Sequence, residues 1–523
     1  MIKKTGRRAV TAVLAAAMMT FGLAPSLAQS PPVRGPLPTR LPPAPVVAPP
    51  TAPLPPQSQA FTPGPLQIVL RPDQAQLLMQ ALSQGEAHGF DPGEFAPAGN
   101  DQASLVNATL RYAKAVHSGR LQISGFREDW GLKPQPYDPT PGFVQAVAAD
   151  RLQDWLNSLP PPYTGYQTLQ RGLANYRGIE ARGGWRSLPV VGDLKPGATG
   201  PQVEALRARL AVEDRLVPAT VSTVPPQAPG APPPAPGAAR PGDPIYDAAL
   251  TDAVKRAQKR FGLEPTGAIG DATRTALDIP VDQRIGQIIA NMERWRWLPQ
   301  QLPSDRIQVN IAAAVLSLFQ GDEPILSMRA VTGRPGNETP MLVSQIQTIV
   351  LNPPWNVPAS IASKELWPKE RASPGYLRRN GYVLMPDGAG GSRIVQPAGP
   401  NAALGVVKFD FPNPYAVYLH DTPTKTTFGR YTRLASHGCV RLEKPRLLAE
   451  TLLAGDPVWT PEQINATIAT GKTVRVPVGR PISVFLLYWT AYMTQDGQMN
   501  FRGDPYGWDG LLIQRIAAQG GAV

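Results

Sequence analysis

Residues 418–441 read YLHDTPTKTTFGRYTRLASHGCVR and hold the only cysteine of the chain, Cys439, with two of its four histidines, His420 and His437. A lone cysteine close to histidines is a candidate nucleophile with its base. Gly438 directly precedes the thiol, where the backbone can turn sharply and aim consecutive N–H groups at one point. The four residues that end at His420 are typical of a strand. The stretch therefore predicts a strand and a tight turn that bring an imidazole and a thiol together.

A buried structural role is the plainest alternative for Cys439, because free cysteine is often a small buried hydrophobe. Two features of the sequence argue against it. The chain begins like an exported protein, in which a free thiol is unusual. Cys439 also has no second cysteine to pair with, so no intrachain disulfide can form.

The pattern H-D-T-x(13)-S-H-G-C-V-R, which runs from His420 to Arg441, resembles the active-site signature of the YkuD-type L,D-transpeptidases. The spacing of nineteen residues from His420 to Cys439 fits that signature. Two further phrases strengthen the resemblance, VTGRPGNETPML at 331–342 and LNPPWNVP at 351–358. The second phrase points to the large periplasmic subgroup of the family.

The resemblance implies that Cys439 is the nucleophile and that His420 is its general base. It also implies that the backbone carbonyl of Asp421 orients the imidazole, although the sequence leaves open whether the carboxylate takes part. His420 can take the thiol proton or form an ion pair with the thiolate, and the charge of Arg441 favours the thiolate. The backbone N–H groups of Gly438 and Cys439 would hold the oxyanion of a tetrahedral intermediate.

His437 is close enough in sequence to be the base instead of His420. A place two residues before Cys439 on a tight turn is, however, a poor one from which to reach the sulfur. The resemblance also assigns the base to the upstream histidine. We therefore expect His437 to shape the site and to help at the oxyanion or the substrate.

Four further residues are candidates for substrate binding. Arg441 offers a planar fork that suits a carboxylate. Tyr418 and Trp355 are expected to line the pocket, with core packing as the alternative for both. Ser436 completes the set within the signature.

The resemblance implies acyl transfer on peptidoglycan. Cys439 attacks the third-residue carbonyl of a tetrapeptide stem, the terminal D-Ala leaves, and an amine of a second stem resolves the thioester to give a 3→3 cross-link. A lipoprotein lysine, a free D-amino acid or water are alternative acceptors, and carbapenems are expected to acylate the same thiol. Two rival hypotheses remain from the sequence: a cysteine hydrolase of stem peptides or of a wall linkage, and a non-catalytic wall-binding protein.

The beginning of the chain predicts export to the periplasm or cell envelope. Residues 1–28 combine a basic head, an apolar run and a small residue at the end, as in a cleaved signal peptide, with an uncleaved anchor as the alternative. Residues 29–65 are dense in proline and predict a disordered linker. The formal net charge of +12 suits a polyanionic surrounding, and for an exported protein the wall is a better partner than nucleic acid. We expect no transmembrane span after signal cleavage, and a monomer.

Helical patterns fill the middle of the chain. Residues 66–190 resemble the helical scaffold domain of the large L,D-transpeptidases, and we expect His88 and His117 there to cap helices or to make local hydrogen bonds. Residues 191–280 resemble a peptidoglycan-binding three-helix module with a disordered insertion at 218–244, and a spacer bundle is the alternative. Val203, Leu206 and Leu210 form the expected apolar stripe of its first helix, and Asp271 is the expected N-cap of its third. Residues 281–305 predict a connecting helix.

Short β-rich runs separated by turn residues begin near residue 306, and they include expected strands over 313–316 and 481–492. They predict a mostly-β, sandwich-type catalytic domain over 306–523, so that the whole chain is a multidomain α+β protein. Residues 361–400 interrupt the strands and predict a lid over the site, with an ordinary surface excursion as the alternative. The sequence has no zinc-ligand cluster, P-loop or dinucleotide fingerprint, so we expect neither a metal nor a cofactor.

Overall fold

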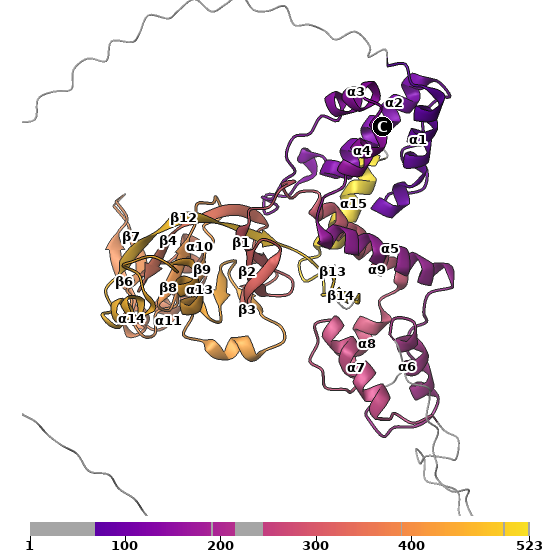
Figure 1. Cartoon of the computed structure of the whole chain (residues 1–523). Coiled ribbons are helices and arrows are strands. Elements are labelled where there is room, and N and C mark those ends of the chain that lie inside the picture. Colours follow the sequence, from indigo (N-terminus) through magenta and orange to yellow (C-terminus); the bar gives the residue numbers. More distant parts are fainter. Residues whose placement is uncertain (1–67, 190–191, 215–243, 389, 495–496, 521–523) are drawn as a thin grey trace, which may run out of the picture. The chain divides into compact units, whose positions relative to one another are not determined.

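A computed structural model of the chain describes residues 68–189, 192–214, 244–388, 390–494 and 497–520 (Figure 1). All of them belong to one compact unit that follows Leu66. The expected signal peptide and proline-rich linker lie outside the described residues, as does nearly all of the expected insertion at 218–244. None of the described helices has the length and apolar composition needed to cross a bilayer.

The first folded region consists of five α-helices and two short 3₁₀ turns. They are α1 (Pro72–Ser83), η1 (Gly85–His88), α2 (Gln102–Ser118), η2 (Ile123–Gly125), α3 (Thr140–Ala148), α4 (Leu152–Ser158) and α5 (Thr164–Ala181). In α2, Asp101 is the N-cap and its carboxylate accepts from the Ser104 N–H at 2.8 Å. The helices enclose an apolar core that includes Leu78, Phe90 and Phe143, each fully buried.

The second region is a three-helix module of α6 (Pro201–Ala211), α7 (Ala248–Arg260) and α8 (Asp271–Asp278). The apolar stripe expected on α6 is confirmed, because Val203, Leu206 and Leu210 are all fully buried. The Asp247 carboxylate caps α7 by accepting from the Leu250 N–H at 2.8 Å. The prediction that residue 271 caps α8 was wrong: Gly270 is the N-cap, and the aspartate is the first helical residue.

Helix α9 (Val281–Trp295) joins the helical regions to the β-rich region. Both partners of its buried ion pair, Glu293 and Arg296, are fully buried, and they lie 3.0 Å apart. Glu293 also accepts from the backbone N–H groups of Arg120 and Leu121, at 2.7 and 3.0 Å. The helix is therefore fixed to the first helical region by charge-assisted hydrogen bonds.

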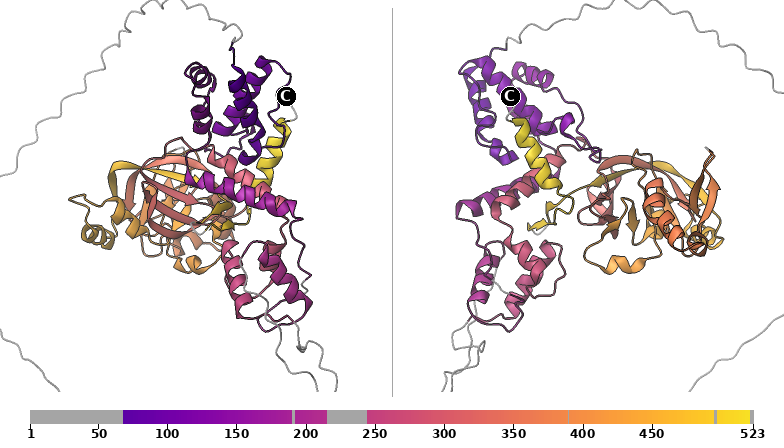
Figure 2. Two further views of the ribbon diagram at one scale, coloured as in Figure 1. Left: turned by 45° about the vertical axis from the view of Figure 1, so that its right-hand side comes forward. Right: turned by 180° about the vertical axis from the view of Figure 1, so that it is seen from behind.

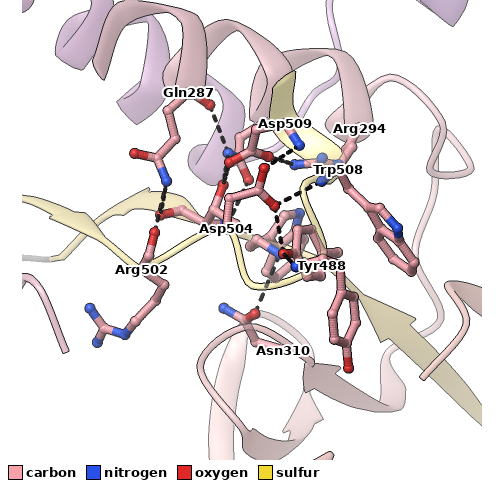
Figure 3. Close-up of polar contacts among 12 residues, drawn as sticks. Gln287, Arg294, Asn310, Tyr488, Arg502, Asp504, Trp508 and Asp509 are labelled. Carbon is pink, nitrogen blue, oxygen red and sulfur yellow. Dashed lines mark hydrogen bonds and ion pairs between the residues drawn. The ribbon is translucent and has the colours of Figure 1, made fainter. Parts of the chain in front are cut away.

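The other side of α9 binds both the last helix, α15 (Trp508–Gly520), and the segment before it, as Figure 3 shows. Arg294 meets the buried carboxylate of Asp509 at 2.6 Å, and Gln287 donates to the backbone carbonyl of Arg502 at 2.8 Å. Both views of Figure 2 place α15 beside the N-terminal helices, and Gln519 accepts from a backbone N–H in that region. The end of the chain thus returns to the region in which the described chain begins.

The β-rich region is built on one mixed sheet, so the expectation of a mostly-β domain is confirmed. Its strands run in the order β10-β3-β11-β9-β8-β4-β12-β1-β2, and β2 also pairs with β3, so the sheet closes on itself. The strands are β1 (Asp305–Asn310), β2 (Val315–Gln320), β3 (Glu323–Gly333), β4 (Leu342–Leu351), β8 (Val407–Asp410), β9 (Leu419–His420), β10 (Leu434–Ser436), β11 (Val440–Leu442) and β12 (Val474–Leu487). The remaining elements here are η4 (Lys425–Gly429), α13 (Pro445–Leu452), α14 (Pro461–Ala469), β13 (Ala491–Met493) and β14 (Met499–Phe501).

Two strand predictions need correction at their ends. The sequence predicted a strand over 313–316, but Ala314 has φ of +50° in the reverse turn between β1 and β2, so the strand begins at Val315. A single strand was predicted over 481–492, but β12 ends at Leu487. Beyond that point the backbone N–H groups of Trp489 and Thr490 donate to side chains instead of to a strand. Their acceptors are the Oδ1 atoms of Asn310 and Asn291, at 3.3 and 3.0 Å.

The interruption at 361–400 folds into a small substructure with its own core. It contains α10 (Ala359–Ile361), the π-helical turn η3 (Ala362–Leu366), α11 (Trp367–Ala372) and α12 (Tyr376–Arg379). A three-stranded sheet completes it, in the order β5 (Trp355–Asn356), β7 (Ser392–Gln396) and β6 (Val383–Pro386). Leu366, Leu377 and Ile394 form its buried centre. Its core is thus separate from the core of the nine-stranded sheet.

Candidate active site

Strand register places the candidate residues in one row. Arg441 of β11 pairs with His420 of β9, which pairs in turn with Lys408 of β8. Their chain neighbours Val440, Leu419 and Phe409 or Val407 are fully buried in the core. Because side chains alternate along a strand, the three polar residues share the outer face of the sheet. Cys439, two residues before Arg441, falls on that face diagonally to His420.

The imidazole of His420 is held in one tautomer. Its Nδ1 lies 2.5 Å from the backbone carbonyl oxygen of Asp421, so Nδ1–H donates and Nε2 is left as the acceptor. Burial is the main cause that lowers the pKa of His420 to about 3, and the charges of Arg441 and Lys408 act in the same direction. The ring is therefore a neutral base throughout the physiological pH range.

Cys439 is a free cysteine and is partly exposed. Burial raises the pKa of the Cys439 thiol above its ordinary value of 9.0, and Tyr418, Lys408 and Arg441 each pull it down. With a neutral imidazole beside it, the thiol rests in its protonated form. Nucleophilic attack then needs proton transfer to His420 during the reaction rather than an ion pair formed beforehand.

The turn before the thiol depends on Gly438, which has φ of +109°. A Cβ at this position would meet the backbone oxygen of Glu338 at 3.2 Å. The Thr339 hydroxyl, from the loop after β3, donates to the Gly438 carbonyl at 2.7 Å. The turn is thus fixed both by its own backbone conformation and by a neighbouring loop.

Ser436 is only 1% exposed, and both of its hydroxyl contacts lie within the turn. It donates to the Cys439 carbonyl at 2.6 Å and accepts from the Gly438 N–H at 3.2 Å. This places Ser436 inside the turn rather than on a surface that a substrate can reach. It also engages one of the two N–H groups expected for the oxyanion, while the Cys439 N–H has no hydrogen-bond partner among the described residues.

The carboxylate of Asp421 points away from the imidazole. It accepts from the backbone N–H groups of Val406 and Thr422 at 2.9 and 2.7 Å, and from Lys425 Nζ at 2.5 Å. Only the backbone carbonyl of Asp421 contacts His420. The side chain therefore fixes the loops around the base and takes no part in a triad.

Arg441 meets no carboxylate within the described part of the chain, and its buried Nε has no hydrogen-bond partner there. Burial lowers the pKa of its guanidinium, and the nearby sulfur of Cys439 raises it. A half-buried cation without an anion beside the thiol is suited to receive a carboxylate from outside the chain.

Tyr418 contacts both the thiol of Cys439 and the side chain of Trp355. The ring of Tyr418 packs edge-on against His420, with centroids 5.5 Å apart, and Lys408 Nζ lies 4.2 Å from the centroid of the same Tyr418 ring. Burial is the main cause that raises the Tyr418 pKa, followed by the neighbouring Cys439, while Trp355 lowers it. Trp355 belongs to β5, so it connects the nucleophile to the substructure at 361–400.

His437 is drawn into a cluster that the sequence did not indicate. Its Nε2 lies 2.6 Å from the carboxylate of Glu365, in the π-helical turn η3. Arg334, directly after β3, lies 3.5 Å from the same carboxylate. Arg334 is part of the phrase VTGRPGNETPML, but nothing in the sequence pairs Glu365 with the signature. The sequence did not indicate Lys408 either, because only the pairing of β8 with β9 brings it beside the imidazole of His420.

A cleft of about 1110 Å³ does not include Cys439 or His420 in its lining. It lies between α5, α7, α9 and the edge of the sheet, and residues 431–434 before the nucleophile turn form part of its wall. The candidate site instead meets the substructure at 361–400, through the contact of His437 with Glu365. No group of three potential metal ligands exists among the residues that the structure places.

Comparison with known families agrees with this geometry. Residues 304–460 match the YkuD family model, described as the L,D-transpeptidase catalytic domain. Residues 70–173 match a model described as "Scaffold domain", and residues 236–277 one described as "Putative peptidoglycan binding domain". The chain thus contains a catalytic domain of the L,D-transpeptidase type, preceded by two helical regions that resemble those of the large subgroup.

Among individual proteins, the chain is 34% identical over 240 residues to a protein of Haemophilus influenzae named "Putative L,D-transpeptidase". That match covers 43% of this chain and 48% of the relative, so the chain spans about half the length of the curated relative it matches. An L,D-transpeptidase structure from Xylanimonas cellulosilytica is 16% identical and covers 57% of this chain and 99% of its own, with a TM-score of 0.18. A catalytic domain from Enterococcus faecium is 13% identical and covers 35% and 99%, with a TM-score of 0.17. TM-scores this low carry no argument about the fold.

Proposed function

We propose that the protein is an exported cysteine acyltransferase that forms 3→3 cross-links in peptidoglycan. The observation that carries the proposal is the tautomer of His420, which leaves Nε2 as a neutral acceptor on the same sheet face as the Cys439 thiol. Such a pair can activate a thiol without a metal or cofactor. The matches to the L,D-transpeptidase catalytic domain and to the peptidoglycan-binding model support the same chemistry.

The first half of the reaction transfers the acyl group to sulfur. Nε2 of His420 takes the thiol proton as Sγ of Cys439 attacks the third-residue carbonyl of a tetrapeptide stem. The Cys439 N–H is the free donor for the developing oxyanion. The C–N bond to the terminal D-Ala then breaks, and the leaving amine takes the proton from the imidazolium.

The second half resolves the thioester. An amine of an acceptor stem loses a proton to His420 and attacks the thioester carbonyl. The S–C bond breaks, and the thiolate regains its proton from the imidazolium. Arg441 stands next to the sulfur without an anion and is placed to bind a stem carboxylate, and Tyr418 and Trp355 form the adjoining wall. Water in place of the amine gives hydrolysis, so exclusion of water decides between the two outcomes.

A product assay tests the proposal directly. The purified protein is incubated with disaccharide-tetrapeptide, and the products are assigned by mass spectrometry. The expected result is a dimer with a 3→3 linkage and released D-Ala, both absent with Cys439→Ala. Tripeptide without dimer would mean hydrolysis, and cross-linking by the cysteine-free variant would disprove the assignment. A carbapenem should add its mass to the wild-type protein and not to Cys439→Ala.

A further inference from the structure

The substructure at 361–400, here called the lid, meets the nucleophile turn through the carboxylate of Glu365. Glu365 lies in η3, a π-helical turn of Ala362–Leu366. Pro368 follows it and cannot supply the backbone N–H that a regular helix would need at that point. Such widened turns occur frequently at functional sites. The turn therefore presents Glu365 to Arg334 and His437.

Hydrogen-bond chemistry assigns the donors of this cluster. Nε2 of His437 lies 2.6 Å from Glu365 Oε1 and 3.2 Å from a guanidinium nitrogen of Arg334. A carboxylate accepts only, so Nε2 must carry the hydrogen and donate it to Glu365. The Arg334 guanidinium then faces another donor at Nε2 of His437. The favourable partner of Arg334 is therefore the Glu365 carboxylate, 3.5 Å away. Two donors thus converge on one carboxylate.

These donors belong to the nucleophile site and not to the lid. His437 is two residues before Cys439. Arg334 follows the last residue of β3, and its backbone N–H donates to the Ser436 carbonyl at 3.1 Å, so it is fixed to the same turn. The pair Arg334 and His437 would remain in place if the lid moved away.

The contact with the lid is weak enough to be exchanged. The side chains of Arg334, Glu365 and His437 are 48%, 34% and 26% exposed. Ion pairs at such exposure contribute little to stability, because water screens them. Burial raises the pKa of Glu365, but His437 and Arg334 outweigh it and hold that pKa below its usual value. The carboxylate is therefore charged and can be displaced by another one.

We propose that Arg334 and His437 form a carboxylate-binding subsite for the donor stem peptide, and that Glu365 of the lid occupies it when no peptide is bound. This inference rests on the proposed function and adds a substrate contact to it. A peptide carboxylate displaces Glu365 and opens the lid. When that carboxylate leaves, Glu365 returns and closes the lid over the nucleophile. Arg441 of β11 is a separate cation, and it contacts no carboxylate among the described residues.

The test measures acylation of Cys439 by tetrapeptides, from the mass of the thioester formed over time. One peptide has all its carboxylates free, a second carries a C-terminal amide, and a third carries an amide on the side-chain carboxylate of its third residue. Arg334→Gln should lower the acylation kcat/KM about tenfold, through KM, for the free peptide. The peptide whose amidation abolishes this dependence identifies the bound carboxylate. Glu365→Gln should raise kcat/KM several-fold, because the competing anion is gone.

Arg334→Gln and Glu365→Gln must change the acylation kcat/KM in opposite directions. If the cluster only latches the lid, both variants loosen it equally, and all three peptides respond alike, which would overturn the subsite. Lys364→Gln, at an exposed lysine of the same turn, is the matched control and should change nothing. If the wild-type protein forms no thioester with any peptide, the proposed function fails instead. A thioester in the wild type with no effect of Arg334→Gln refutes the subsite alone.

Discussion

At the scale of the residue, the protonation states of Cys439 and His420 decide the chemistry. Burial disfavours a thiolate–imidazolium ion pair, because it raises the pKa of the Cys439 thiol and lowers the pKa of the His420 imidazole to about 3. The cationic Arg441 opposes the first shift and adds to the second. The site therefore keeps a neutral pair at rest and separates charge only during attack.

The pH dependence of acylation tests this resting state. Neutral thiol and neutral imidazole persist between pH 5 and 8, so kcat/KM for acylation should be flat across that range. If His420 had the ordinary pKa of 6.5, kcat/KM would fall as the pH drops below that value, because the protonated ring cannot accept the thiol proton. A preformed thiolate in equilibrium with thiol would instead make the rate rise about tenfold per pH unit. The rate of acylation by a carbapenem is measured at each pH by mass spectrometry of samples quenched at set times. A kcat/KM that changes with pH in either of these ways would contradict the neutral pair.

Alkylation measures the thiol itself, because Cys439 is the only cysteine in the chain. The iodoacetamide reaction should reach half its maximal rate above pH 9.0, the ordinary value. Arg441→Gln should move that midpoint further up, since it removes a charge that lowers the thiol pKa. Arg446→Gln, at an exposed arginine of α13, should leave it unchanged. A midpoint near neutrality would show that the thiol is ionised at rest.

At the scale of the element, the turn between β10 and β11 holds the thiol in place. Its conformation needs a residue that tolerates positive φ, and its hydrogen bonds come from Ser436 within the turn and from Thr339 outside it. The register of β11 with β9 then sets the thiol diagonal to the imidazole. A change in the turn should therefore affect activity more than global stability.

Gly438→Ala tests the turn. The new Cβ would sit 3.2 Å from the Glu338 carbonyl at φ of +109°, so the turn must shift. We expect a loss of about 1–2 kcal/mol in unfolding free energy and a fall of roughly 10²-fold in kcat. The control is Gly429→Ala, where a Cβ meets nothing within 4 Å. Activity retained in Gly438→Ala would mean that the turn geometry does not govern the reaction.

At the scale of the whole molecule, α9 connects the parts. The carboxylate of Glu293 in α9 accepts from backbone N–H groups of the first helical region, and Arg294 holds the start of α15 through its ion pair with Asp509, which Figure 3 shows. The return of the C-terminal helix to the N-terminal helices adds a second connection. The helical regions and the sheet are thus coupled through buried polar contacts as well as apolar packing.

Glu293→Ala tests this connection. It leaves Arg296 fully buried without its carboxylate and removes the acceptor of two backbone N–H groups. We expect a loss of about 3–5 kcal/mol, as for other broken buried pairs. Urea unfolding followed by fluorescence measures it. Asp154→Ala, in the exposed pair with Arg151, should change stability by less than about 0.5 kcal/mol. Equal effects of the two variants would show that the buried pair does not join the regions.

The sequence by itself determined the local features of this protein. Helical periodicity predicted the stripe of Val203, Leu206 and Leu210, and the spacing within residues 418–441 predicted a strand and a turn that carry His420 and Cys439. These features depend on nearest neighbours along the chain, so local patterns are sufficient to find them. The tertiary structure alone decided that Ser436 is buried, that the carboxylate of Asp421 points away from the base, and that Lys408, Arg334 and Glu365 join the site. The reason is physical: strand register and lid docking bring together residues far apart in sequence, and burial then sets their charge states.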